Sequence, residues 1–99
     1  MSYVKTTVRE ILSDTAPTDA WKLQELQRLL FREERSRDDK KQAIETLEAS
    51  KPKDRKKNRE WLDANRHDYE LHKENIESIL EAIADIRERT IGKQLDLFE

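Results

Sequence analysis

The sequence of 99 residues has no cysteine, one glycine and two prolines, and it has no long apolar run. Without cysteine, the chain can form neither disulfides nor thiol-based catalytic sites. So few turn-forming residues argue against β architectures, whose many turns need glycine and proline. No stretch is apolar enough to span a membrane, and the first residues lack the apolar region of a signal peptide. We therefore expect a cytoplasmic protein without membrane contact.

Charge dominates what is present. Charged residues make up 42% of the chain and hydrophobic residues 34%, a composition typical of long helices and coiled coils. Twenty basic and 22 acidic residues give a formal net charge of −2, so no overall field attracts the chain to nucleic acid. The apolar supply is small for a monomer of this length, which leaves a homodimer as an alternative.

The spacing of apolar residues and of helix breakers predicts an all-α domain over residues 1–91. It comprises a short N-terminal helix and a long antiparallel helical hairpin, with helices at about 3–13, 19–50 and 52–90. Pro17 and Thr18 mark the start of the second helix. Ser50 precedes Pro52, which disfavours helix at Ser50 and suits the first turn of the third helix. Gly92 is expected to stop that helix and to begin an extended tail over 92–99.

The second predicted helix contains a highly charged stretch without apolar residues, REERSRDDKKQ at 32–42. Leu30 before the stretch and Ile44 after it are two heptads apart, which favours one continuous helix. The alternative is a helix that restarts at Ser36, because Ser36 and Asp39 have the spacing of a capping box.

The third predicted helix has two heptad rows, Leu62, Tyr69, Ile76 and Ile83 in one and Asn65, His72, Ile79 and Ile86 in the other. A turn near residue 51 makes the long helices antiparallel neighbours. The pairs then predicted along the hairpin are Leu23 with Ile79, Leu26 with Ile76, Leu30 with His72, Glu33 with Tyr69, Arg37 with Asn65 and Lys40 with Leu62. The apolar pairs form a helical head joined by the first helix, and the polar pairs form a protruding charged arm of about 30 Å.

Six cations gather at the predicted end of the arm, within KPKDRKKNRE. They are Lys51, Lys53, Arg55, Lys56, Lys57 and Arg59, and we call them the arm tip. Cations on a protruding hairpin suit phosphates, and Trp61 beside them suits stacking on a base. The alternative is a solvated turn, since charged helices often contain such runs.

No residue pattern predicts catalysis. His67 and His72 are five residues apart and do not share a helical face, and only Glu33 or Glu34 of the second helix can join them around a metal ion. Carboxylate pairs are too common here to single out a general acid and base. We therefore expect no enzyme, no metal and no cofactor. His72 in a core row is expected to set the pairing register of the helices.

Residues 94–98 read QLDLF. Gln94-Leu95-Asp96-Leu97-Phe98 closely resembles the peptide by which bacterial replication and repair proteins bind the DNA sliding clamp, the β subunit of the replicative polymerase. The family pattern is Gln-Leu-(Ser/Asp)-Leu-Phe, and all five positions match. With ordinary residue usage, the four fixed positions match by chance about once in 10⁵ windows. The resemblance covers five of 99 residues and implies a partner but not a fold.

The resemblance implies a role for each residue of the tail. Leu97 and Phe98 are the expected apolar anchors in the cleft of the clamp, Gln94 a polar contact that fixes register, Leu95 a secondary packing residue and Asp96 a residue at the rim. An extended tail can place alternate side chains in a groove while its backbone forms hydrogen bonds. The alternative is a tail that packs on the helical body, against Leu23, Leu26 and Ile83.

The function predicted from these features is that of a small non-enzymatic protein that docks on the bacterial sliding clamp. It either acts at replicating DNA or blocks the protein-binding cleft, as a replication inhibitor encoded by a phage or plasmid would. Two alternatives stay open at this point. One is a helical dimerisation module, and the other is a nucleic-acid binder that acts through the arm tip.

Overall fold

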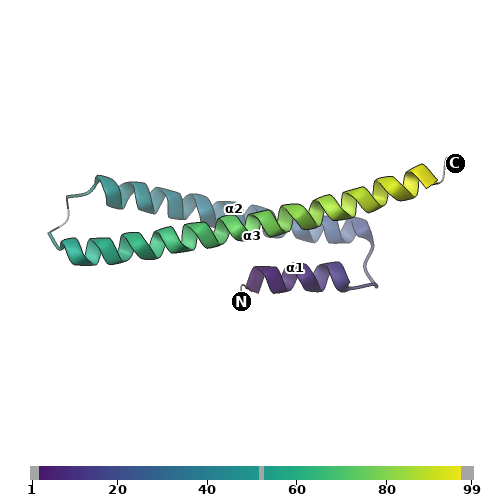
Figure 1. The fold of residues 1–99 in the computed structure, drawn as a ribbon, viewed down its shortest axis with the longest axis horizontal. Coiled ribbons are helices and arrows are strands. Elements are labelled where there is room, and N and C mark those ends of the chain that lie inside the picture. Colours follow the sequence, from purple (N-terminus) through teal and green to yellow (C-terminus); the bar gives the residue numbers. More distant parts are fainter. Residues whose placement is uncertain (1–2, 52, 97–99) are drawn as a thin grey trace.

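A computed structural model describes residues 3–51 and 53–96, with side chains described through Thr90. The described residues form three helices and no strand, α1 (Tyr3–Ser13), α2 (Asp19–Ala49) and α3 (Arg55–Asp96). α2 and α3 form a long antiparallel hairpin, and α1 lies beside the half of the hairpin where α2 begins (Figure 1). The molecule measures 68 × 23 × 15 Å along its principal axes. The predicted all-α hairpin is confirmed.

α2 begins where the sequence predicts and continues through the charged stretch. Thr18 is its N-cap, because the hydroxyl oxygen of Thr18 accepts a hydrogen bond from the backbone N–H of Trp21 at 3.2 Å. Such a cap satisfies a backbone donor that the helix leaves without a partner. Residues 32–42 are helical throughout, so the restart at Ser36 does not occur.

Both ends of α3 differ from the prediction. α3 begins at Arg55 and not at residue 52, because the carboxylate of Asp54 accepts a hydrogen bond from the backbone N–H of Lys57 at 3.1 Å and so acts as the N-cap. Pro52 lies outside the described residues. At the other end, α3 continues through Gly92 to Asp96. A single glycine costs a helix only about 1 kcal/mol, so it weakens a long helix without having to end it.

The tail that the sequence predicts as extended is therefore helical over residues 92–96. Residues 97–99 lie outside the described part of the chain. Gly92 is an interior helical residue in the structure, which the local pattern did not anticipate because glycine is commoner just after a helix than within one.

The apolar core lies at one end of the hairpin, as predicted. α1, α2 and α3 each contribute buried residues to one cluster, namely Val4, Val8, Leu26, Leu29, Ile79, Ala82, Ile83 and Ile86. Leu26, Ile79 and Ile86 have no exposed surface. Fully burying such a side chain contributes about 1.5–3 kcal/mol, so this helical head supplies most of the hydrophobic stabilisation.

Polar contacts fasten the helices around the head. Lys22 is buried, and its ammonium group donates a hydrogen bond to the carbonyl oxygen of Leu12 in the last turn of α1 at 3.3 Å. A cation at this place also interacts favourably with the helix dipole. The one hydroxyl proton of Thr90 on α3 is shared between the carbonyl oxygen of Ile86, at 3.0 Å, and the carboxylate of Asp19 at the start of α2, at 3.5 Å. These contacts join the three helices around the head.

Within the described residues, none of the helices is both long and apolar enough to cross a membrane.

Candidate functional site

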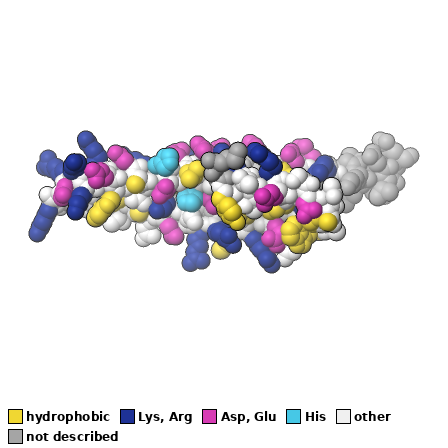
Figure 2. All heavy atoms as spheres, turned by 90° about the horizontal axis from the view of Figure 1, so that it is seen from below, with side chains coloured by type: hydrophobic (Ala, Val, Ile, Leu, Met, Phe, Trp, Pro, Cys, Tyr) yellow, Lys and Arg dark blue, Asp and Glu magenta, His cyan; other side chains and the backbone are white. Residues whose placement is uncertain are grey.

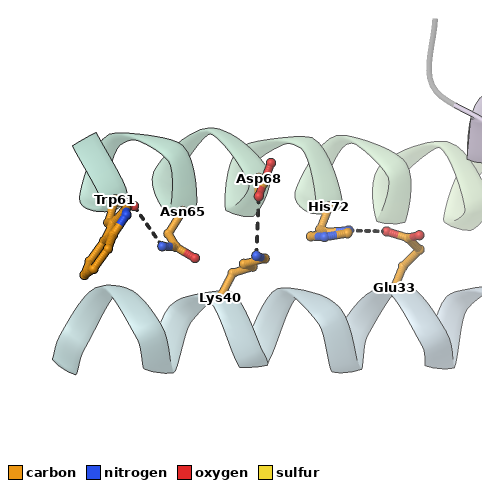
Figure 3. A network of polar contacts seen from close by, with 6 residues as sticks. All are labelled: Glu33, Lys40, Trp61, Asn65, Asp68 and His72. Atoms are coloured by element: carbon orange, nitrogen blue, oxygen red, sulfur yellow. Dashed lines mark hydrogen bonds and ion pairs between the residues drawn. The ribbon is translucent and has the colours of Figure 1, made fainter. Parts of the chain in front are cut away.

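A buried polar cluster separates the helical head from the arm. The Nδ1 atom of His72 lies 2.6 Å from a carboxylate oxygen of Glu33, and the side-chain amide of Asn75 donates a hydrogen bond to the same oxygen at 3.3 Å. Figure 3 shows Glu33 and His72 pointing toward each other across the hairpin. Glu33 is 6% exposed and Asn75 is 3% exposed. The cluster therefore joins α2 and α3 through a carboxylate that is almost completely buried.

This cluster is chemically suited to a structural role. A polar residue in a core row fixes register because a shifted pairing would leave it buried without a partner. Among the residues that the structure describes, no group of three or more His, Cys, Asp or Glu side chains is arranged to hold a metal ion. His67 is exposed, as are Asp63 and Glu70 on either side of it. The sequence singled out His72 and Glu33 but paired them with Leu30 and Tyr69, whereas the structure pairs them with each other. Lys40, predicted to meet Leu62, pairs with Asp68, so the register of the hairpin differs from the predicted one. Asn75 was missed, because its only signal is its spacing of three residues from His72.

The arm is thin and held by polar contacts. Across 34–51 and 53–74, the described side chains are exposed or half-buried and none is buried. Lys40 pairs with Asp68 at 3.4 Å and Arg66 pairs with Glu48 at 2.8 Å, both across the two helices (Figure 3 draws the first pair). Exposed pairs contribute about 0–1 kcal/mol each, so the arm adds little stability of its own.

The arm tip is exposed at the end of the hairpin that lies farthest from the head. All six of its cations are exposed, and Figure 2 shows Lys and Arg side chains gathered at this end. Arg55, Lys56, Lys57 and Arg59 occupy the first two turns of α3, and Lys51 and Lys53 precede the helix. Within the described part of the chain, none of the six forms an ion pair. The structure thus brings the predicted cations together on one protruding end.

Trp61 follows the arm tip on α3 and is 59% exposed. It lines an open hollow between α2 and α3 together with Gln42, Thr46, Asn65 and neighbouring residues. In Figure 3, Trp61 and Asn65 both extend from α3 toward α2. The side-chain amide nitrogen of Asn65 donates to the carbonyl oxygen of Trp61 at 2.8 Å. We call this feature the tip hollow.

The residues of the clamp-like peptide that the structure describes lie at the other end of α3 from the arm tip. Gln94, Leu95 and Asp96 are the last residues of α3, and their side chains lie outside the described part. Leu97 and Phe98 lie outside it altogether. Because Thr90 pairs with the first residue of α2, residues 91–96 extend past the end of α2, and Figure 1 shows this end of α3 projecting from the head.

Comparison with known protein families, with curated protein sequences and with solved structures finds no match for this chain. The functional argument therefore rests on the chemistry of the residues and on their positions along the hairpin.

Proposed function

We propose that this chain docks on the bacterial DNA sliding clamp through Gln94–Phe98. The single observation that carries the proposal is the full match of these five residues to the clamp-binding pattern. The position of the motif is compatible with docking. The core residues that the structure describes all precede Thr90, and the backbone of 91–96 continues away from α2 (Figure 1).

Docking in an extended form requires the last turn of α3 to unwind. The terminal turn of a helix lacks partners for its last carbonyl groups. Each helical residue adds at most about 0.3 kcal/mol when its propagation constant is near 1.6, so releasing residues 93–96 costs about 1 kcal/mol. Burying the side chains of Leu97 and Phe98 contributes about 1.5–3 kcal/mol each. The gain exceeds the cost of unwinding, although ordering the peptide consumes part of it.

The test is direct binding of the purified chain to a purified bacterial sliding clamp, measured by calorimetry or surface plasmon resonance. The double substitution Leu97→Ala with Phe98→Ala is expected to weaken binding about 100-fold or more, because it removes both apolar anchors. The matched control is Leu71→Ala with Leu80→Ala, which removes two exposed apolar side chains of α3. This control is expected to bind as wild type.

Three results would oppose the proposal. They are an intact chain that does not bind the clamp, a double variant that binds as well as wild type, and a control pair that weakens binding equally. A synthetic peptide with the sequence of 94–98 provides a further comparison, because it should compete with the intact chain for the same cleft.

The proposal has two versions, and the same reagents separate them. A chain that blocks the cleft inhibits clamp-dependent DNA synthesis once it is stoichiometric with the clamp sites, and the Leu97→Ala, Phe98→Ala variant does not. A chain that uses the clamp to reach replicating DNA leaves synthesis largely unchanged at the same occupancy and becomes concentrated on DNA that carries a loaded clamp.

A further inference from the structure

The arm tip differs electrostatically from the rest of the hairpin. Nearer the head, Lys40 and Arg66 each find a carboxylate across the two helices. Within residues 51–60, the six cations of the arm tip are accompanied by two carboxylates, those of Asp54 and Glu60, a net of +4 in a chain whose total is −2. Asp54 is already engaged, because its carboxylate caps α3 through the backbone N–H of Lys57. The tip is therefore a local positive field on an acidic protein, and it suits an external polyanion.

The tip hollow adds a feature that charge alone does not explain. Trp61 is one of the largest apolar side chains in the protein, yet it is 59% exposed and lies two residues after Arg59. The hollow beside it is lined by the amides of Gln42 and Asn65, the hydroxyl of Thr46 and the carboxylate of Asp39, together with Ala43 and Leu47. Amide and hydroxyl groups are the side chains that hydrogen-bond the edges of bases, and an indole ring offers a face for stacking.

We propose that the arm tip and the tip hollow together bind single-stranded nucleic acid. The phosphates lie along the cations of the arm tip, a base stacks on the indole of Trp61, and the polar groups of the hollow contact the edge of that base. A base inside a duplex has both faces covered by its neighbours, so only an unstacked base can use Trp61. The hydrogen-bonding groups of the hollow favour a base over the acyl region of a lipid surface.

Binding is tested by fluorescence anisotropy with a labelled oligodeoxythymidylate of about 12 nucleotides, within the site sizes usual for such proteins. If four of the six cations each contact one phosphate, the slope of log K against log salt concentration is about −3 for a single strand. The same measurement with a duplex of equal length is expected to show weaker binding.

Two variants separate the charge from the aromatic ring. Lys56→Glu with Lys57→Glu is expected to weaken binding by about tenfold or more and to flatten the salt slope. Its matched control is Arg32→Glu with Arg35→Glu, the same change in net charge at two exposed positions of α2, and this control should lose much less. Trp61→Ala is expected to lose roughly 5- to 100-fold, and Trp61→Phe is expected to retain most of the affinity.

Several outcomes would overturn the proposal. They are no binding at low salt, equal losses in both charge-reversal pairs, and a Trp61→Ala variant with unchanged affinity. Duplex binding as tight as single-strand binding would show a mere cationic surface, and tighter Trp61-dependent binding to vesicles of anionic phospholipid would show a membrane site instead. Circular dichroism establishes that each variant keeps its helices.

The site is independent of the proposed clamp docking. The variant Leu97→Ala with Phe98→Ala is expected to bind the oligonucleotide as wild type does, and the Lys56→Glu, Lys57→Glu variant is expected to bind the clamp as wild type does. A failure of clamp docking and a failure of oligonucleotide binding can therefore be told apart.

Discussion

Removing the carboxylate of Glu33 is expected to destabilise the hairpin more than any other single charge deletion on α2. Glu33 is 6% exposed and accepts from both His72, at 2.6 Å, and Asn75, at 3.3 Å. A hydrogen bond to a charged group contributes about 1.5–3 kcal/mol and a longer neutral-donor bond about 0.5–1.5 kcal/mol. Glu33→Ala is therefore expected to cost about 2–4 kcal/mol of unfolding free energy.

The measurement is urea unfolding followed by circular dichroism, with Glu45→Ala as the control. Glu45 is an exposed glutamate of the same helix, and its replacement is expected to change the unfolding free energy by less than about 0.5 kcal/mol. Glu33→Gln keeps an acceptor oxygen and the side-chain volume, so it should lose less than Glu33→Ala.

A double-mutant cycle tests whether the side chains of Glu33 and His72 act as a unit. Replacing both by Leu removes the buried carboxylate together with its hydrogen-bond partner and extends the apolar core along the hairpin. The double variant is expected to recover most of the stability that Glu33→Leu alone loses. If Glu33→Ala unfolds like Glu45→Ala, the buried carboxylate does not stabilise the hairpin. If the effects of Glu33→Leu and His72→Leu on the unfolding free energy are additive, the two side chains do not act as a unit.

Three further predictions concern the head and the two ends of α3. Ile79→Ala is expected to cost about 2–5 kcal/mol in the same unfolding assay, because the side chain has no exposed surface and leaves a cavity; an exposed apolar residue, Leu80, serves as its control. Asp54→Ala is expected to cost about 1 kcal/mol by removing the N-cap of α3, while Asp54→Asn should retain most of the cap. Gly92→Ala stabilises the helix by up to about 1 kcal/mol. If docking unwinds residue 92, this substitution should weaken clamp binding by up to about fivefold. Equal binding by Gly92→Ala and Gly92→Pro would show that residue 92 does not unwind.

Much of the fold is readable from the sequence because apolar spacing and helix breakers agree there. Thr18 begins α2 as predicted, and the heptad relation between Leu30 and Ile44 correctly identifies one unbroken helix. The ends of α3 were harder, because each depends on a single residue. α3 begins after Asp54 because its carboxylate accepts a hydrogen bond from a backbone N–H of the first turn, which a proline side chain cannot do.

The spacing of apolar residues predicts which face of a helix is apolar better than it predicts which residues of that face are buried. Trp21 and Phe31 share the first turns of α2 with the core leucines, yet they are 44% and 67% exposed. Asn75 shows the opposite case. It lies outside the two heptad rows, and yet it is buried and bonded to Glu33 of α2. These outcomes depend on which neighbour covers each residue, and that is a property of the assembled hairpin.

The candidate sites were predictable to different degrees for a physical reason. A linear peptide such as QLDLF carries its recognition chemistry in consecutive residues, so it can be found without knowledge of the fold. The six cations of the arm tip lie within the nine residues 51–59 and were found in the same way. The tip hollow combines Gln42 and Thr46 of α2 with Trp61 and Asn65 of α3, and only the pairing of the two helices brings them together.

α3 relates the two proposed contacts to each other. It begins among the cations of the arm tip and ends at Asp96, within the peptide proposed to bind the clamp, and its 42 residues span about 63 Å at 1.5 Å per residue. Sites this far apart share no side chains, so their binding free energies should add rather than interfere. A clamp docked at one end would then leave the arm tip available to a single strand, and joining two modest contacts on one chain raises the affinity for a target that carries both. The long arm is sparsely packed and contributes little to folding. In this arrangement its role is to hold the arm tip away from whatever binds the other end of α3.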